Sequence, residues 1–224
     1  MQADRMFTTR KLVILAMISA IAFILTTPPF RFPLVPAVSF LRFDAKDVVI
    51  VIGGFMFGPV AALVVVIVVA LVQMFTISDT GIIGFLMNVI SGVAFCGTAS
   101  LIYSKWRTMR GAVFGLITAV LLTTCVMLMW NYLVTPWFMG VSREVVVRML
   151  IPGFLPFNLI NYSINAALIL LIYKSVRAAM IAARIMPQPE DNEKMRLFSP
   201  ISLVVGGFLL LTCVLWVAAL QGWI

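Results

Sequence analysis

Long apolar runs separated by short polar connections dominate the chain, and they predict membrane-spanning helices rather than a soluble core. No segment shows the alternation of apolar and polar residues that the strands of a membrane β-barrel require. The apolar stretch at residues 48–77 is too long for one span and is divided at Gly58-Pro59. The pattern predicts seven helices, at about residues 11–27, 46–57, 59–77, 82–104, 111–135, 156–178 and 199–220.

Composition and charge support a multi-pass membrane protein. The chain is 63% hydrophobic and 11% charged, with a mean hydropathy of +1.14, which is far from the composition of soluble domains. Its net charge of +8 could suggest a nucleic-acid partner, but the basic residues gather in alternate connections, at residues 5–11, 105–110 and 174–196. This distribution follows the positive-inside rule, so it argues against nucleic acid and predicts a cell-membrane protein with a cytoplasmic N-terminus.

The two longest structureless connections fall on the outer side in this topology. They are residues 26–43, which are rich in proline, and residues 137–155, in which Glu144 and Arg148 are spaced for an exposed ion pair. Loops of this length are often lids or binding elements, so we expect a ligand to enter from outside.

Several kinds of chemistry lack their usual residues. The chain has no histidine, and Cys96, Cys125 and Cys213 are scattered through apolar runs, so neither a disulfide framework nor a metal site is indicated. No glycine-rich loop ends in Gly-Lys-Ser/Thr, so this chain is not expected to hydrolyse ATP by that route. No nucleophile with a neighbouring base is evident either, and we predict no catalytic residue and no resident cofactor.

Carboxamide side chains are the most informative polar residues in the predicted spans. Asn158, Asn161 and Asn165 follow a helical spacing and share one face, and Asn131 lies near the outer end of the preceding helix. Burying an amide without a partner costs about 2–7 kcal/mol, so each either pairs between helices or binds a ligand. The candidate substrate-binding residues are these four together with Asn88, Gln73 and Trp130, although Trp130 could instead belong to an interfacial aromatic belt.

Two aspartates precede the second predicted helix. In one interpretation Asp44 caps this helix and Asp47 occupies its first turn, where a carboxylate favours the helix dipole. In the other, both contact the hydroxyl groups of a ligand, and we include both among the candidate substrate-binding residues.

A pair of small residues marks the first helix. Ala16 and Ala20 form a small-xxx-small pattern that permits close helix approach, either within this chain or to a partner.

Six motifs in order resemble the riboflavin-specific S subunits (RibU type) of energy-coupling factor (ECF) transporters. The motifs are Ala-Met-Ile-Ser-Ala (16–20), Phe-Leu-Arg-Phe-Asp-Ala-Lys-Asp-Val (40–48), Ile-Gly-Gly-Phe-Met-Phe-Gly-Pro (52–59), Leu-Met-Asn (86–88), Trp-Asn-Tyr-Leu-Val-Thr-Pro (130–136) and Leu-Pro-Phe-Asn-Leu-Ile (155–160). The resemblance extends from about residue 8 to residue 178. It implies six helices around an outward-opening riboflavin cavity, and a complex with a transmembrane coupling subunit and two ATPases.

The resemblance also assigns residue roles and exposes two differences. Asn131 and Asn158 match the flavin-contacting asparagines of the family, and Ala16 and Ala20 match its docking surface. At Asn161 the family pattern has lysine, so a neutral amide replaces a charge. The family pattern has no counterpart for residues 179–224.

The expected architecture is therefore an all-α membrane protein, a six-helix S-subunit bundle with one additional C-terminal transmembrane helix. We divide it into a substrate-binding membrane domain at 1–178, a cytoplasmic linker at 179–198 and the extra helix at 199–224. The expected function is capture of extracellular riboflavin for ATP-driven uptake. An S subunit for another vitamin or a flavin-related heterocycle is the alternative, and a membrane enzyme or a scaffold is less favoured.

Overall fold

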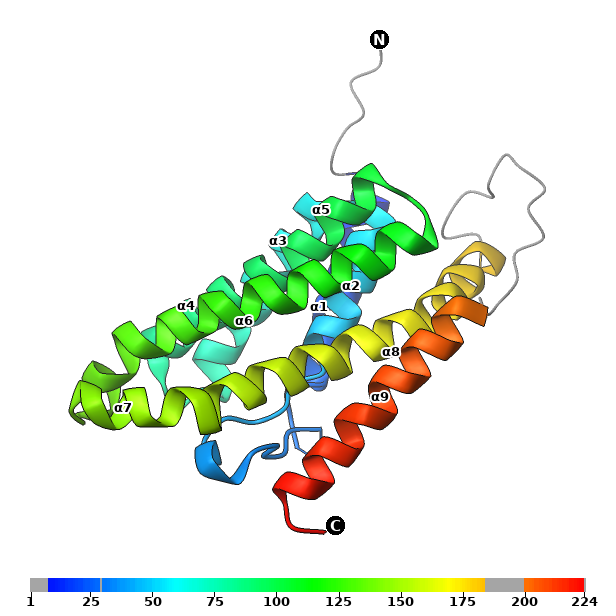
Figure 1. Ribbon diagram of the computed structural model, residues 1–224. Coiled ribbons are helices and arrows are strands. Elements are labelled where there is room, and N and C mark those ends of the chain that lie inside the picture. The colour runs from blue at the N-terminus through cyan, green and yellow to red at the C-terminus, as the bar shows by residue number, and fades with distance from the viewer. Residues whose placement is uncertain (1–7, 29, 184–199, 224) are drawn as a thin grey trace.

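The computed structural model describes residues 8–28, 30–183 and 200–223, and its regular structure is helical (Figure 1). In the described part of the chain, β-pairing is limited to one isolated bridge between Pro33 and Arg42. The α-helices are α1 (Thr9–Ile24), α2 (Lys46–Phe57), α3 (Pro59–Thr76), α4 (Gly81–Gly92), α5 (Thr98–Lys105), α6 (Met109–Met139), α7 (Arg143–Met149), α8 (Leu155–Ala182) and α9 (Pro200–Leu220). The expected all-α membrane fold is confirmed.

Within the described residues, five helical stretches are long and apolar enough to cross a membrane. They are Pro59–Thr76, Gly81–Lys105, Met109–Met139, Arg143–Ala182 and Leu203–Leu220. The helices α1 and α2 have 16 and 12 residues, fewer than the roughly 20 that a full span needs. The seven predicted helices are therefore present, but two of them are too short to span by length alone.

Two π-helical turns join helices that would otherwise be separate. One, Val93–Gly97, connects α4 to α5, and the other, Leu150–Phe154, connects α7 to α8. The expectation of an irregular outer loop at 137–155 is thus wrong over most of its length. Pro152 and Gly153 lie inside the second π-turn, where the regular hydrogen-bond ladder is already interrupted, so they do not end the helix.

The end of α6 also differs from the prediction. The helix was expected to stop before Pro136, yet it continues to Met139 and ends at Gly140, which has φ 64°. A proline in the last turn removes only one late backbone donor, and the left-handed glycine supplies the usual helix stop.

The apolar core has two parts. The larger part gathers α1, α2, α3, the π-turn Val93–Gly97, α5, α6 and α8. The smaller part joins residues 34–43 to the π-turn before α8, to α8 and to α9. Gly153 allows the fully buried Val38 to approach the π-turn, since a Cβ at this position would lie 2.6 Å from Val38 Cγ1. The long 26–43 connection is therefore packed against the bundle.

Helix α9 packs along α8 (Figure 1). Its Cys213 is buried and belongs to the smaller core, with Val217 and Leu220 beside it. The helix α8 extends to Ala182, so the first residues of the expected linker are helical, and 184–199 lie outside the described residues. The division into two membrane parts and a linker stays a prediction.

Candidate ligand-binding cavity

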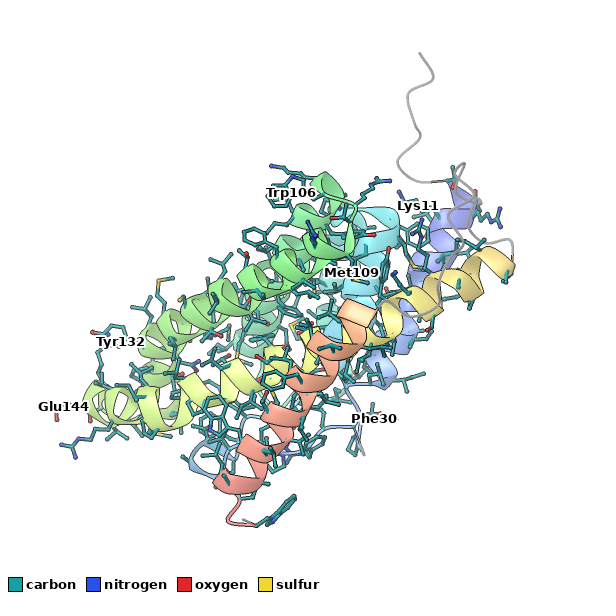
Figure 2. The ribbon with its side chains drawn as sticks, turned by 45° about the vertical axis from the view of Figure 1, so that its right-hand side comes forward. Lys11, Phe30, Trp106, Met109, Tyr132 and Glu144 are labelled. Carbon is teal, nitrogen blue, oxygen red and sulfur yellow. The ribbon has the colours of Figure 1, made fainter. Side chains whose placement is uncertain are left out.

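A cavity of about 640 Å³ lies at one end of the bundle. Its wall is formed by the connection after α1, the start of α2, the end of α3, α4, the end of α6 and the start of α8. Lys11 and Trp106 lie at the other end of the molecule, as Figure 2 shows, whereas Phe30, Tyr132 and Glu144 lie toward the end that holds the cavity. The cavity thus occupies the end that the charge distribution predicts to face outward.

Eight of the nine candidate substrate-binding residues lie on this wall. They are Asp44, Asp47, Gln73, Asn88, Trp130, Asn131, Asn158 and Asn161, whereas Asn165 is not among the lining residues. Segments far apart in sequence supply them, and the bundle brings them to one place. Their contact with a ligand stays a prediction.

Asn131 on α6 and Asn158 on α8 are both buried, with exposed fractions of 4% and 2%. Each Nδ2 donates to the carbonyl four residues earlier in its own helix, Met127 and Phe154 respectively, at 2.7 Å. The side-chain Oδ1 of Asn131 also accepts from Thr135 Oγ1 at 3.0 Å. An amide nitrogen has two donors, so each asparagine keeps one donor for a ligand, and Asn158 keeps its acceptor as well.

The two other asparagines of α8 bind the chain just before α2. Asn161 Oδ1 accepts from the backbone N–H of Asp44 at 3.3 Å, and Asn165 Nδ2 donates to the Asp44 carbonyl at 3.1 Å. Asn165 also donates to the Asn161 carbonyl at 2.8 Å and is fully buried. Asn165 therefore connects α8 to this segment instead of facing the cavity.

The capping interpretation of the aspartates is partly wrong. The N-cap residue of α2 is Ala45, and the Asp44 carboxylate accepts instead from the Lys46 backbone N–H, through Oδ1 at 3.0 Å. The Asp44 carboxylate thus binds the first backbone N–H of α2, although Asp44 lies one residue before the N-cap. Asp47 does lie in the first turn, buried, and its Oδ1 accepts from Cys96 Sγ at 3.6 Å.

Gln73 and Trp130 complete the predicted set. Gln73 is 4% exposed near the end of α3, and its buried Oε1 has no hydrogen-bond partner among the described residues. An unpaired buried acceptor is costly, so this atom is available to a donor from a ligand or from water. Trp130 is half-buried on α6.

The sequence reasoning missed several lining residues, of which Lys46 is the most informative. Its side chain is buried and its Nζ binds the Asp44 carboxylate and Asn88 Oδ1. The available signal was a lysine between two aspartates in Asp-Ala-Lys-Asp. Charged residues on the wall balance, because the basic residues are Arg31, Arg42 and Lys46 and the acidic residues are Asp44, Asp47 and Asp79.

Two surface predictions have different outcomes. Ala16 and Ala20 are exposed on α1, next to the exposed Met17, so they do not pack inside this chain. Glu144 and Arg148 lie on the short helix α7, and no ion pair joins these two residues.

In the described part of the chain, no group of three or more His, Cys, Asp or Glu side chains is placed to hold a metal ion.

A helical bundle with an amide-lined cavity at one end is the architecture of a membrane protein suited to hold a small molecule. Residues 10–173 match the family model described as "ECF transporter, substrate-specific component". The chain therefore belongs to this family, and it is a multi-pass membrane protein.

Individual relatives agree with the family assignment. The chain is 31% identical over 173 residues to the riboflavin transporter RibU of Staphylococcus aureus (strain TCH60), covering 74% of this chain and 89% of the relative. It is 29% identical over 173 residues to the riboflavin transporter FmnP of Bacillus subtilis (strain 168), covering 73% and 90%. A solved structure described as the S component of a bacterial ECF transporter superposes with a TM-score of 0.65 at 31% identity, covering 77% of this chain and 98% of that one.

The comparisons confirm the resemblance inferred from the sequence motifs. The matched region of the family model ends at residue 173, before the end of α8, and so it does not include α9.

Proposed function

We propose that this chain binds riboflavin outside the cell and passes it to an ATP-driven uptake complex in the cell membrane. The observation that carries the proposal is the cavity wall, in which Asn131 and Asn158 present spare amide hydrogen-bonding groups beside apolar and aromatic side chains. The names of the relatives point to the same ligand.

The chemistry of riboflavin suits this wall. Its ring system offers apolar area worth about 25 cal/mol per Å² buried, and the imide-like edge of the ring needs both donors and acceptors. The polar segment around Asp44 offers partners for the ribityl hydroxyl groups. Because three basic and three acidic residues balance on the wall, a neutral flavin fits better than a phosphorylated one.

The orientation follows from charge. Lys11, Lys105, Arg110 and Lys174 belong to the helix ends opposite the cavity. The positive-inside rule places that end in the cytoplasm, so the N-terminus is cytoplasmic and the cavity opens outward.

The proposed partners are a transmembrane coupling subunit and two ATPase subunits. The sequence contains no phosphate-binding loop of the Gly-Lys-Ser/Thr type, so we assign ATP hydrolysis to the partners and substrate binding to this chain. The exposed Ala16 and Ala20 would allow close approach of a partner helix to α1.

Flavin fluorescence tests this function directly. The purified chain, freed of bound ligand, is titrated with riboflavin, riboflavin 5′-phosphate and thiamine. We expect saturable quenching with riboflavin at one per chain, weaker binding of the phosphate, and no competition by thiamine. Absence of saturable riboflavin binding, with tight binding of another vitamin in the same assay, would instead favour the alternative S-subunit function.

A further inference from the structure

Lys46 is a buried cation on the cavity wall. It is the first residue of α2, it is 6% exposed, and it lies among the residues that line the cavity. A buried ammonium group is strongly unfavourable unless it is paired and hydrogen-bonded. Its partners therefore decide what this group can do.

The described residues satisfy two of its three donors. Lys46 Nζ donates to Asp44 Oδ2 and to Asn88 Oδ1, the latter at 3.3 Å, and no third partner is found in the described part of the chain. An ammonium group carries three N–H donors and no acceptor. One donor therefore remains for an occupant of the cavity.

Two helices fix the position of this cation. Asp44 is held through its backbone by Asn161 and Asn165 of α8, and Asn88 belongs to α4. The ammonium group thus lies between two walls of the cavity, in a geometry set before a ligand arrives. Preorganised donors of this kind bind without a further ordering cost.

The same network includes Asn161, the neutral residue at the position where the resemblance places a lysine. The side-chain Oδ1 of Asn161 accepts from the Asp44 backbone N–H, so this amide supports the segment that carries Lys46. In this chain a buried cation lies in the first turn of α2, where it is paired with Asp44.

We propose that Lys46 is a specificity-determining residue that donates its third N–H to a neutral oxygen of the ligand. The inference rests on the proposed function, with riboflavin as the ligand. Because Asp44 balances the charge, the donor suits a carbonyl or hydroxyl oxygen and discriminates against the phosphate of riboflavin 5′-phosphate.

The main test is the double variant Lys46→Met with Asp44→Asn, which removes the donor together with the carboxylate bonded to it, while the buried Asp47 keeps its contact with Cys96. The purified full chain is titrated with riboflavin and with lumiflavin, which has a methyl group in place of the ribityl chain. We expect riboflavin affinity to fall roughly 10- to 100-fold, the scale of a lost hydrogen bond from a charged donor. An equal loss for lumiflavin assigns the contact to a ring oxygen, and a loss for riboflavin alone assigns it to a ribityl hydroxyl.

Two matched variants serve as controls. Lys46→Arg keeps the charge and the donors and should retain most of the affinity, and Lys105→Met removes an exposed lysine far from the cavity and should bind like the parent. Parent-like riboflavin binding by the double variant would overturn the role of Lys46 alone. A parent chain that does not bind riboflavin would overturn the proposed function and this inference with it.

The single variant Asp44→Asn gives a second test that holds even if the double variant does not fold. It keeps an acceptor but removes one negative charge beside Lys46, so that only Asp47 is left as a carboxylate near the ammonium group. The ratio of riboflavin to riboflavin 5′-phosphate affinity should then shift at least roughly tenfold toward the phosphate. An unchanged ratio would show that the ammonium group does not face the ligand.

Discussion

Asn161 Oδ1 accepts a hydrogen bond from the backbone N–H of Asp44 at 3.3 Å, joining two residues 117 positions apart. This contact ties the start of α8 to the segment before α2, beside a cavity that both elements line. It holds the backbone of Asp44, and with it the beginning of α2, against α8.

Asn165 should contribute to stability more than to ligand recognition. It is fully buried, it donates to the Asp44 carbonyl, and it does not line the cavity. We expect Asn165→Ala to destabilise the protein by about 1–3 kcal/mol, because a buried carbonyl loses its donor. Thermal unfolding in detergent measures the change, and an unaltered midpoint would contradict the assigned structural role.

Asn131 and Asn158 should act mainly on binding. Replacing either by alanine should weaken riboflavin binding by about 1–3 kcal/mol, because a polar group of the ligand is then left without its partner. Fluorescence titration of each folded variant provides the measurement. The matched control is Thr118→Ala, which alters a polar side chain of α6 that bonds only within its own helix and does not line the cavity. If both cavity variants bind like the parent, the ligand does not contact these amides.

Removal of α9 should separate stability from affinity. None of the described side chains of α9, from residue 203 on, lines the cavity. Cys213, Val217 and Leu220 pack with the 34–43 segment, and Gln221 Nε2 donates to the Leu34 carbonyl at 3.5 Å. A chain ending at residue 184 should therefore unfold at a lower temperature while its riboflavin affinity stays nearly unchanged. Loss of saturable binding in a truncated protein that remains folded would show that α9 is needed to complete the cavity.

Partner docking should depend on the small residues of α1. Both Ala16 and Ala20 are exposed, and replacing both with tryptophan would prevent close approach of another helix. Riboflavin binding by the isolated protein should survive, because neither residue lines the cavity. Uptake of riboflavin in cells that carry the coupling subunit and ATPases should be abolished. Parent-level uptake would leave α1 as a lipid-facing helix without a docking role.

Local sequence patterns were sufficient to predict the helices and the candidate amides. Apolar runs of about span length form helices in lipid because each backbone group must be satisfied within its own segment. For the same reason an asparagine inside such a run, such as Asn131 or Asn158, could be identified as structurally or functionally important before any fold was known. The Gly58-Pro59 break between α2 and α3 was equally local.

Turn residues were less reliable guides. Residues 137–155 were expected to form an irregular connection, yet Pro136 lies within α6, and Pro152 and Gly153 lie within the π-turn before α8. Val38 packs against Gly153, which is far from it in the sequence. The helix and turn propensities of single residues cannot predict such a contact.

The sequence by itself determined an all-α membrane bundle with amides in its apolar runs, because helix formation depends on neighbouring residues. Only the tertiary structure decided which polar side chain serves which purpose. Asn161 and Asn165 share one helix face, yet only Asn161 lines the cavity while both hold Asp44. Lys46 likewise binds its neighbour Asp44 and, where packing brings α4 close to α2, also Asn88. Buried polar groups need hydrogen-bond partners, and a partner distant in sequence comes within reach only through packing.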